Sequence, residues 1–166
     1  DLLDINRITR GTLSFERANL DSRELVARGV EIARPAMDAA KHQLEISLPE
    51  EAVHVMGDPD RLTQVLANVL NNASRYTPPN GSISVSLDEE DGEVTIRVRD
   101  NGRGIEARNL ERIFNLFDQG DVVAPSAAGG LGIGLSLAKR VVEMHGGTIE
   151  ARSGGPNQGS EFVIRL

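Results

Sequence analysis

Two alternating runs of apolar residues, separated by one acidic turn, limit the folds that are open to this chain. Apolar and polar residues alternate at 83–87 and again at 94–98, and the turn between the two runs reads DEEDG. A period of two places the apolar side chains on one face of a strand, and the short turn makes the two strands antiparallel neighbours. A hairpin with a single apolar face is not stable alone, so other elements must cover that face.

Amphipathic helices are predicted to provide this cover. Asp21 with Glu24 forms a capping-box start, and helical spacing of apolar residues then continues to about residue 40. Asp58 followed by Pro59 is the pattern of an N-cap and a first helical residue, and it opens a second helix. The other predicted elements are strands at 44–48, 53–56, around 149 and at 162–164, a short helix near 108–114, and a helix at about 132–145. This order predicts an α/β (α+β) two-layer sandwich, in which a mostly antiparallel sheet of about five strands is covered on one face by about three helices.

Composition restricts the chain to a few functional classes. With 166 residues and 39% hydrophobic content, the chain is expected to form one domain with a real core. It has no cysteine, so neither disulfides nor thiolate metal sites are expected, and no apolar run approaches the roughly 18 residues of a membrane span. A net charge of -7, scattered arginines and 3% aromatic residues argue against binding to nucleic acid. A phosphate ligand would therefore be held by backbone amides, a metal ion or a few side chains.

Three asparagines interrupt the helix that begins at Pro59, in the stretch LANVLNNASRYTPP at 66–79. Asparagine favours caps and turns over helix interiors, so their presence needs a reason. At 100 degrees per residue, Asn68, Asn72 and Arg75 lie along one flank of the apolar stripe, whereas Asn71 faces solvent. This flank presents amide oxygens and a guanidinium to a ligand lying against the sheet. The alternative is a polar boundary that only contacts solvent.

A second motif, RDNGRG at 99–104, directly follows the strand at 94–98. Asn-Gly is typical of a simple hairpin turn, which is the alternative interpretation. A helical pattern follows instead of a strand, so we expect the two glycines to let the backbone approach a ligand. Asp100 lies at the strand end, where a partly buried carboxylate would need a hydrogen-bond donor. The exocyclic amine of a purine is such a donor.

A third motif, GGLGIGL at 129–135, ends a loop and opens a helix. The unpaired N–H groups and the dipole of a helix N-terminus form an anion site, although a flexible linker is the alternative. No Gly-Lys-Ser/Thr follows, and Leu135 stands where a dinucleotide-binding motif has glycine. Both of these common nucleotide motifs are therefore disfavoured.

Together these motifs resemble the catalytic and ATP-binding domain of sensor histidine kinases, the two-component signalling enzymes with the Bergerat (GHKL-type) fold. The resemblance covers nearly the whole chain. The N box is similar to residues 64–73 and 75–78, the first glycine box to 100–105, the F box to 113–117, and the second glycine box with its following helix to 130–135 and 143–147. Residues 1–15 are similar to the tail of the dimerisation helix and its linker, and residues 16–166 to the catalytic and ATP-binding domain.

The resemblance implies roles for individual residues. Asn72 would give its amide oxygen to the Mg2+ that bridges the triphosphate, Asn68 would support the same polar row, and Arg75 would approach the phosphates. In these terms Asn68 and Arg75 are the catalytic candidates and Asn72 is the metal ligand. Asp100 would accept a hydrogen bond from the adenine amino group, and Tyr76 would flank the nucleotide. The remaining ATP-contacting positions would be Gly102, Gly104, Ile105, Phe117, Gly130, Leu131, Gly132, Gly134 and Leu135.

Two departures from the family pattern shape the expected activity. The loop at 118–128 contains no Lys or Arg, which leaves Arg75 as the expected cation for the γ-phosphate. The three histidines, His42, His54 and His145, all lie outside the acceptor setting of the family. The resemblance therefore implies a protein-histidine kinase fragment that phosphorylates the dimerisation domain of its own homodimeric parent, with a response regulator receiver domain downstream. This fragment would be cytoplasmic, whether or not the parent is anchored in the inner membrane.

Two alternatives remain for the function. One is an ATPase switch of the related gyrase, mismatch-repair and heat-shock chaperone group, and the other is a degenerate module that only binds nucleotide. Those ATPases have glutamate at the position that Asn68 resembles, and a neutral amide does not accept a proton from water. Asn68 therefore favours phosphoryl transfer over hydrolysis.

Overall fold

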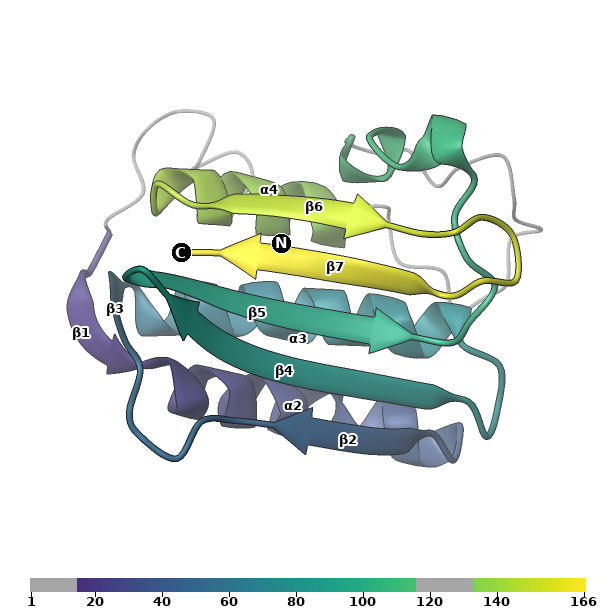
Figure 1. Ribbon diagram of the computed structural model, residues 1–166, viewed down its shortest axis with the longest axis horizontal. Helices are drawn as coiled ribbons and strands as arrows, with labels where there is room; N and C mark the ends of the chain where they lie inside the picture. The colour runs from purple at the N-terminus through teal and green to yellow at the C-terminus, as the bar shows by residue number, and fades with distance from the viewer. Residues whose placement is uncertain (1–14, 116–132) are drawn as a thin grey trace.

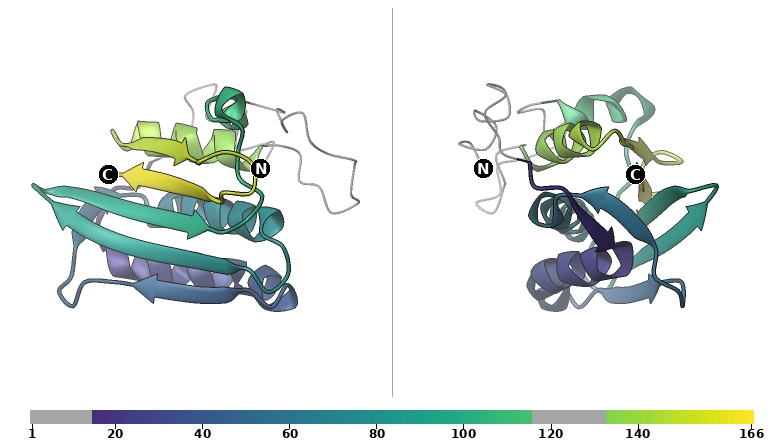
Figure 2. Two further views of the ribbon diagram at one scale, coloured as in Figure 1. Left: turned by 45° about the vertical axis from the view of Figure 1, so that its right-hand side comes forward. Right: turned by 90° about the vertical axis from the view of Figure 1, so that its left-hand side faces the viewer.

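The computed structural model describes residues 15–115 and 133–166, which form a sheet with helices on one face. The helices are α2 (Ser22–Ala39), α3 (Pro59–Tyr76) and α4 (Gly134–Met144), with short 3-10 turns η1 (Ala107–Asn109) and η2 (Arg112–Phe114). The strands are β1 (Ala18–Asp21), β2 (Gln43–Ser47), β3 (His54–Gly57), β4 (Ser82–Glu90), β5 (Glu93–Asp100), β6 (Thr148–Arg152) and β7 (Ser160–Arg165). The predicted two-layer sandwich is confirmed (Figure 1, and edge-on in Figure 2).

The main sheet has five strands in the order β2-β4-β5-β7-β6. Strand β2 runs parallel to β4, and every other neighbouring pair is antiparallel, as the sequence predicted. The β4–β5 hairpin turns at Asp91 and Gly92, whose φ angles of 53° and 78° suit a tight hairpin turn. Val85 pairs with Val98 across the hairpin, so the alternating apolar residues share the buried face.

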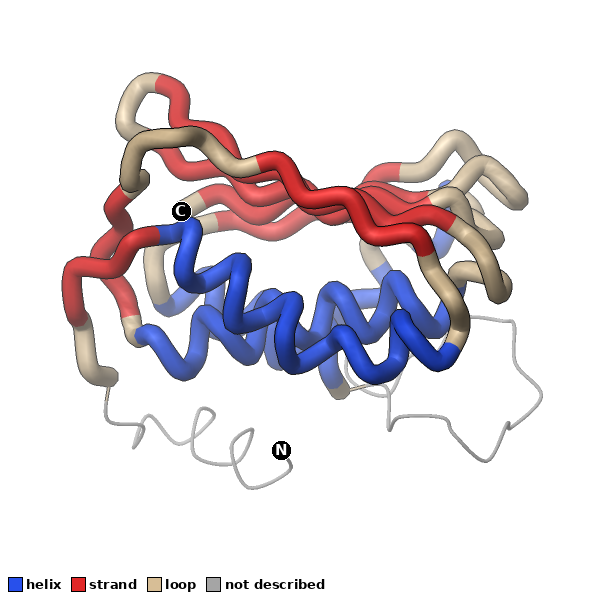
Figure 3. The backbone as a smooth tube through the Cα atoms, turned by 90° about the horizontal axis from the view of Figure 1, so that it is seen from below, coloured by secondary structure: helices blue, strands red, loops and turns tan. Residues whose placement is uncertain are grey.

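Among the described residues, the three α-helices pack on that one face, and no described helix covers the other face of the sheet (Figure 3). Helix α3 lies between α2 and α4 and contributes the largest share of buried helical side chains. Its buried residues are Leu62, Thr63, Val65, Leu66, Ala67, Val69, Leu70, Ala73 and Ser74. Each of these positions falls within the apolar stripe that the sequence predicted or directly beside it. The position of α3 fixes the direction of its polar flank.

Both predicted helix starts are confirmed by their caps. Asp58 accepts hydrogen bonds from the backbone N–H groups of Asp60 and Arg61, both at 3.1 Å. Asp21 accepts from the N–H of Arg23 at 3.0 Å, and the Arg23 guanidinium bonds the same carboxylate. This guanidinium lowers the pKa of Asp21 to about 2.

Three details of the fold differ from the sequence-based expectation, and a fourth expectation is not tested. Strand β1 was not predicted, because the stretch ANLD has only four residues, too few for their alternation to indicate a strand; it pairs with β3 in a separate two-stranded sheet. The short helix near 108–114 is replaced by η1 and η2. Helix α4 begins at Gly134 instead of 132, and the helix expected at 1–10 lies outside the described residues.

Helices α2 and α3 approach closely at Gly29. A Cβ atom at this position would lie 2.6 Å from the Cβ of Leu66, which is closer than packed side chains allow. Alanine at this position would stabilise α2 through its higher helix propensity. This gain in stability is smaller than the cost of forcing the two helices apart.

We expect Gly29→Ala to lower the free energy of unfolding by about 1 to 3 kcal/mol, because overpacking has costs of this size. Urea denaturation measures the change. Ala27 is exposed on the same helix, and Ala27→Gly supplies the effect of helix propensity alone, about 1 kcal/mol. A Gly29→Ala variant more stable than the parent would contradict the packing argument.

Candidate functional site

The polar flank of α3 lies where the sequence placed it. Asn68 and Asn72 are half-buried at the border of the core, whereas Asn71 and Arg75 are exposed. The side-chain Nδ2 of Asn68 donates to the backbone oxygen of Gly134 at 3.1 Å. This bond connects the flank of α3 to the first residue of α4.

The sequence predicts an anion site at the N-terminus of α4, and this role stays a prediction. The helix begins at Gly134, and the preceding Ile133 provides no side-chain cap. The N–H groups of the first helical turn are therefore directed at the space beyond the helix end, where the helix dipole favours an anion. Leu135 is partly buried and packs against the core. Phe117, Gly130, Leu131 and Gly132 lie outside the described residues.

Asp100 ends strand β5 with a buried carboxylate, only 4% exposed. Its Oδ1 accepts a hydrogen bond from the N–H of Gly102 at 2.8 Å, and its Oδ2 accepts from the Ser160 hydroxyl at 2.6 Å. Sequence reasoning predicted the partly buried carboxylate but missed both of these donors. Two carboxylate oxygens have about four acceptor positions, so the pair of bonds orients the group and leaves capacity for another donor.

The glycines after Asp100 are required by the protein's own packing. A Cβ at Gly102 would lie 2.3 Å from the backbone oxygen of Tyr76, and a Cβ at Gly104 would lie 2.0 Å from the backbone oxygen of Gly155. Gly104 also has a φ of 72°, which favours glycine. The expected close approach of backbone is present, but its partner is another part of the chain. Contact of these glycines with a nucleotide stays a prediction.

The turn after β5 is attached to the C-terminal end of α3. The N–H of Arg103 donates to the backbone oxygen of Tyr76 at 3.1 Å, and the Arg103 guanidinium carbon lies 4.1 Å from the centre of the Tyr76 ring. Such stacking of a cation on an aromatic ring is attractive. One end of α3 therefore meets the Asp100 turn, and the flank of the same helix meets α4.

The region beyond this turn is also anchored to the sheet layer. Ile105 is partly buried against the core, and its N–H donates to the Ser153 hydroxyl at 3.0 Å. The structure thus brings most of the described candidates around α3. Asp100, Gly102 and Tyr76 lie at its C-terminal end, and Asn68 contacts Gly134 on its flank.

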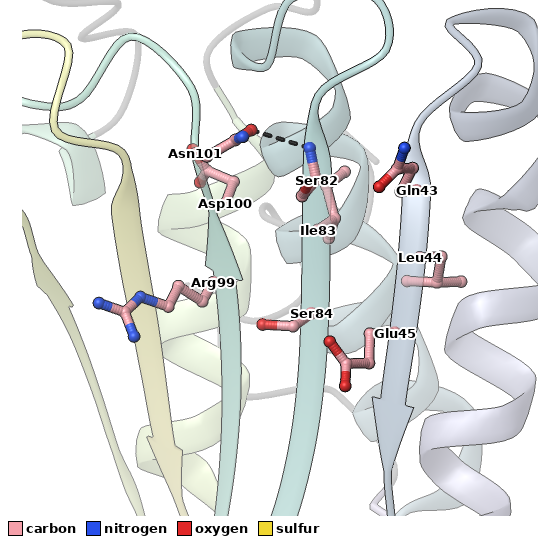
Figure 4. Close-up of a pocket in the computed structure, with 9 residues that line it drawn as sticks. All are labelled: Gln43, Leu44, Glu45, Ser82, Ile83, Ser84, Arg99, Asp100 and Asn101. Carbon is pink, nitrogen blue, oxygen red and sulfur yellow. Dashed lines mark hydrogen bonds between the residues drawn. The ribbon is translucent and has the colours of Figure 1, made fainter.

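A separate hollow of about 410 Å³ lies over strands β2, β4 and β5 (Figure 4). Glu45, Ser84 and Arg99 face it from positions that are paired in register across the three strands. These side chains alternate with the buried ones, so the hollow belongs to the open face of the sheet. Asp100 also contributes to the lining of the hollow, but its two carboxylate oxygens are bonded to Gly102 and Ser160. The candidate site is therefore the region around α3 and α4.

Comparison with known proteins identifies the family of the chain. The profile of the histidine kinase-, DNA gyrase B-, and HSP90-like ATPase family matches residues 57–166. The chain belongs to this family.

The relatives narrow the class to sensor histidine kinases. Sensor protein SrrB of Staphylococcus aureus is 38% identical over 109 residues, which are 66% of this chain and 18% of SrrB. The mycobacterial sensor histidine kinase MprB has a similar structure, with a TM-score of 0.77 and 27% identity over 91% of this chain and 97% of that one. Full-length ShkA in complex with AMPPNP gives a TM-score of 0.85 and 25% identity over 99% of this chain and 34% of ShkA.

These findings confirm the predicted family, the Bergerat fold and the ATP-binding catalytic domain of a sensor histidine kinase. The chain spans about 18% of the length of SrrB, so its matched part is one domain of a longer relative. Within the described residues, no helix has the combination of length and hydrophobicity needed to cross a membrane.

We expect Ser160→Ala to lower the free energy of unfolding by about 1.5 to 3 kcal/mol, because a buried carboxylate loses one of its donors. Urea denaturation measures the loss. Ser82→Ala is the matched control, since Ser82 is an exposed strand residue that uses its backbone N–H, bonded to Asn101. Equal stabilities of the two variants would show that the Ser160 hydroxyl does not support Asp100.

Proposed function

We propose that the site around α3 binds ATP with Mg2+ and transfers the γ-phosphoryl group to a histidine on a separate dimerisation domain. The observation that carries this proposal is the buried Asp100 carboxylate, which is oriented by Gly102 and Ser160. It lies at the C-terminal end of the helix whose flank bears Asn68 and Asn72. A hydrogen-bond acceptor for the purine amine and the proposed metal-binding and phosphate-binding groups thus lie around one helix, α3.

Asp100 is the group that selects the base. A carboxylate accepts hydrogen bonds only, and adenine presents an amine where guanine presents a carbonyl. A guanine base would place an acceptor against the carboxylate, which disfavours its binding. Tyr76 flanks this position, and its ring is held by Arg103. The AMPPNP complex of ShkA supports an adenine nucleotide as the ligand.

Asn72 is the proposed metal ligand. Mg2+ prefers oxygen ligands and keeps several waters, so one amide oxygen together with phosphate oxygens is a suitable shell. Asn72 is half-buried on the flank of α3 and makes no side-chain hydrogen bond to another described residue. Its amide oxygen is therefore available to a cation, whose role would be to neutralise the phosphate charge.

The phosphates are proposed to lie near the N-terminus of α4. The N–H groups of this helix end lack a side-chain cap, and Asn68 holds the end against α3. Arg75, exposed in the last turn of α3, supplies a positive charge on the same flank. Phosphoryl transfer depends mainly on such positioning and charge neutralisation.

Transfer to a histidine is favoured over hydrolysis by the amide of Asn68. In the transfer, the bond from the γ-phosphorus to the bridging oxygen breaks, ADP leaves, and a bond from phosphorus to an imidazole nitrogen forms. An amide does not remove a proton from water, so position 68 offers no general base for hydrolysis. The three histidines of the chain, His54 included, lie outside the acceptor setting of the family, and His42 and His145 also use their ring nitrogens in contacts within the protein. The acceptor is therefore proposed to be supplied by another domain.

The remaining assignments follow from the sensor kinase class and are proposals for the parent protein. Residues 1–15 would continue a dimerisation helix, and residues 16–166 would form the catalytic and ATP-binding domain. The parent would be a homodimer whose phosphorylated dimerisation domain passes the phosphoryl group to a response regulator receiver domain. This domain would be cytoplasmic, and an anchor in the inner membrane would belong to other parts of the parent.

We expect Asn72→Ala to weaken the Mg2+-dependent part of ATP binding by about 1 to 3 kcal/mol, because the metal loses an oxygen ligand in a partly buried site. Titration calorimetry with and without Mg2+ measures this part. Asn71→Ala is the matched control, because Asn71 is exposed one position away on the same helix. Equal affinities of Asn72→Ala and the parent would remove Asn72 from the metal site.

We expect the chain alone with Mg-ATP to remain unphosphorylated on histidine and to hydrolyse ATP slowly, yet to phosphorylate its own dimerisation domain when that is added. Radiolabel from γ-32P-ATP, stable in alkali and labile in acid, reports the transfer. The control is a dimerisation domain whose acceptor histidine is replaced by alanine. Rapid phosphate release without the partner would favour the ATPase alternative, and ATP binding without any transfer would favour the degenerate module.

A further inference from the structure

The ring of His145 lies where four parts of the chain meet. His145 ends helix α4, and its Nε2 lies 3.0 Å from the backbone nitrogen of Asp58, the N-cap of α3. A backbone N–H is only a donor, so Nε2 must be the acceptor. The ring proton is then on Nδ1, which donates to the backbone oxygen of Val141 at 2.7 Å. These partners require the neutral form of the ring.

The surroundings of the ring are shaped to hold it. A Cβ at Gly57 would lie 2.8 Å from Cδ2 of His145, so glycine at this position makes room for the imidazole. On another side, the Phe15 ring packs on the imidazole with 4.4 Å between ring centres. The carboxylate of Asp58 caps α3 and also accepts from the N–H of Glu16 at 3.3 Å. The segment at 15–17 is thus attached to both His145 and Asp58.

Helices α3 and α4 are connected by polar bonds at two places. At one, Asn68 of α3 bonds Gly134 at the start of α4. At the other, His145 at the end of α4 accepts from Asp58 at the start of α3. The first bond belongs to the proposed phosphate end of the site, and the second lies beside the segment at 15–17. A helix of 11 residues joins the two, so displacement of its C-terminal end also shifts its N-terminal end.

Burial lowers the pKa of His145 below its ordinary value of 6.5, and this effect exceeds the opposing effect of the Asp58 carboxylate. The Arg17 guanidinium also lowers it. Charged and titratable groups lie on each element around the ring. They are Glu16 and Arg17 before β1, His54 on β3, Asp58, Asp60 and Arg61 at the start of α3, and Lys139, Arg140 and Glu143 on α4. A group with a lowered native pKa is protonated more easily in the unfolded chain. Its contribution to stability is therefore present above about pH 6.5 and is lost as the pH falls towards the native pKa.

We propose that His145 is a positioning residue whose neutral ring attaches α4 to the start of α3 and to the segment at 15–17, and thereby maintains the nucleotide site. When the ring is protonated, Nε2 becomes a donor facing the N–H of Asp58, and the bond is lost. The connection between the segment at 15–17 and the N-terminus of α4 is then weakened. The nucleotide part of this inference rests on the proposed function, whereas the junction itself does not.

The first experiment uses the unmodified chain without nucleotide. Proton and nitrogen NMR follows the His145 ring and the Asp58 backbone amide between about pH 8 and pH 5. We expect both signals to change with one midpoint, below the ordinary histidine value. An Asp58 amide that does not follow the His145 titration would overturn the inference, and this result needs no variant that must fold.

The second experiment measures Mg-ADP affinity at about pH 7.5 and about pH 5 in the parent and in His145→Gln. Glutamine keeps an acceptor oxygen but does not titrate in this range. Between the two pH values, we expect the fold-loss of Mg-ADP affinity to be at least about five times larger in the parent than in His145→Gln. A factor of about five is the lower end of typical coupling between two sites. The titration of the nucleotide's own phosphates is common to both proteins and cancels in this ratio.

The two other histidines provide matched controls. His54 is exposed on β3, and His42 lies at the opposite end of α3, where its Nε2 contacts the backbone oxygen of Thr77 at 3.0 Å. His54→Gln and His42→Gln should keep the pH dependence of the parent. Phe15→Ala should expose the ring of His145 and move its NMR midpoint back towards 6.5.

The possible outcomes separate the two proposals. If no protein binds Mg-ADP at about pH 7.5, the proposed function fails, and the NMR titration still decides the junction. If the Asp58 amide follows His145 but the parent and His145→Gln lose affinity equally, the coupling to the nucleotide site is wrong. A loss of pH dependence in His42→Gln would assign the effect to the other end of α3 and would also overturn the proposal.

Discussion

The burial of the apolar stripe of α3 against the sheet is the interaction on which the rest of the structure depends. Val65, Val69 and Leu70 are each 2% exposed or less, and they belong to one hydrophobic core with the inner-face residues of the β4–β5 hairpin. Because this stripe fixes the rotation of the helix, it also fixes the direction of Asn68 and Asn72 on the flank. The rotation of α3 therefore determines both the packing of the core and the direction of the two asparagines. A change in the core would rotate the helix and move these proposed ligand-binding side chains.

An acidic chain that binds a triphosphate has to overcome its own charge. The net charge of -7 repels an anion at long range, but salt at physiological strength screens such interactions beyond about 8 Å. Binding is then decided by groups in contact with the ligand. In the proposed function, the N–H groups of α4, the cation of Arg75 and a metal at Asn72 are such groups, and Asp100 would hold the base away from the phosphates. Such a separation would let a carboxylate take part in binding an anionic ligand.

The parts of the structure that the sequence predicted depend on local patterns. The alternation in β4 and β5, the caps at Asp21 and Asp58, and the flank of α3 each follow from residues a few positions apart. The position of Asp100 at a strand end was also predictable from a local pattern, because the residues of the strand itself indicate where it ends. The parts that were missed depend on residues far apart in the chain. Ser160 reaches Asp100 across 60 positions, and His145 reaches Asp58 across 87.

The two glycines after Asp100 were correctly singled out from the sequence, but the reason given for them was incomplete. The two glycines after Asp100 were expected to admit a ligand, and the structure shows that they first admit the carbonyl groups of Tyr76 and Gly155. A periodic pattern carries no information about such backbone contacts, since the partner is set by the tertiary fold. The same holds for Gly57, which makes room for the His145 ring. In each case glycine is required because two distant segments approach within the space of a single methyl group. Gly102 meets the end of α3, Gly57 meets the end of α4, and Gly104 meets the segment between β6 and β7. The two motif glycines, Gly102 and Gly104, therefore have a structural role that does not need a nucleotide.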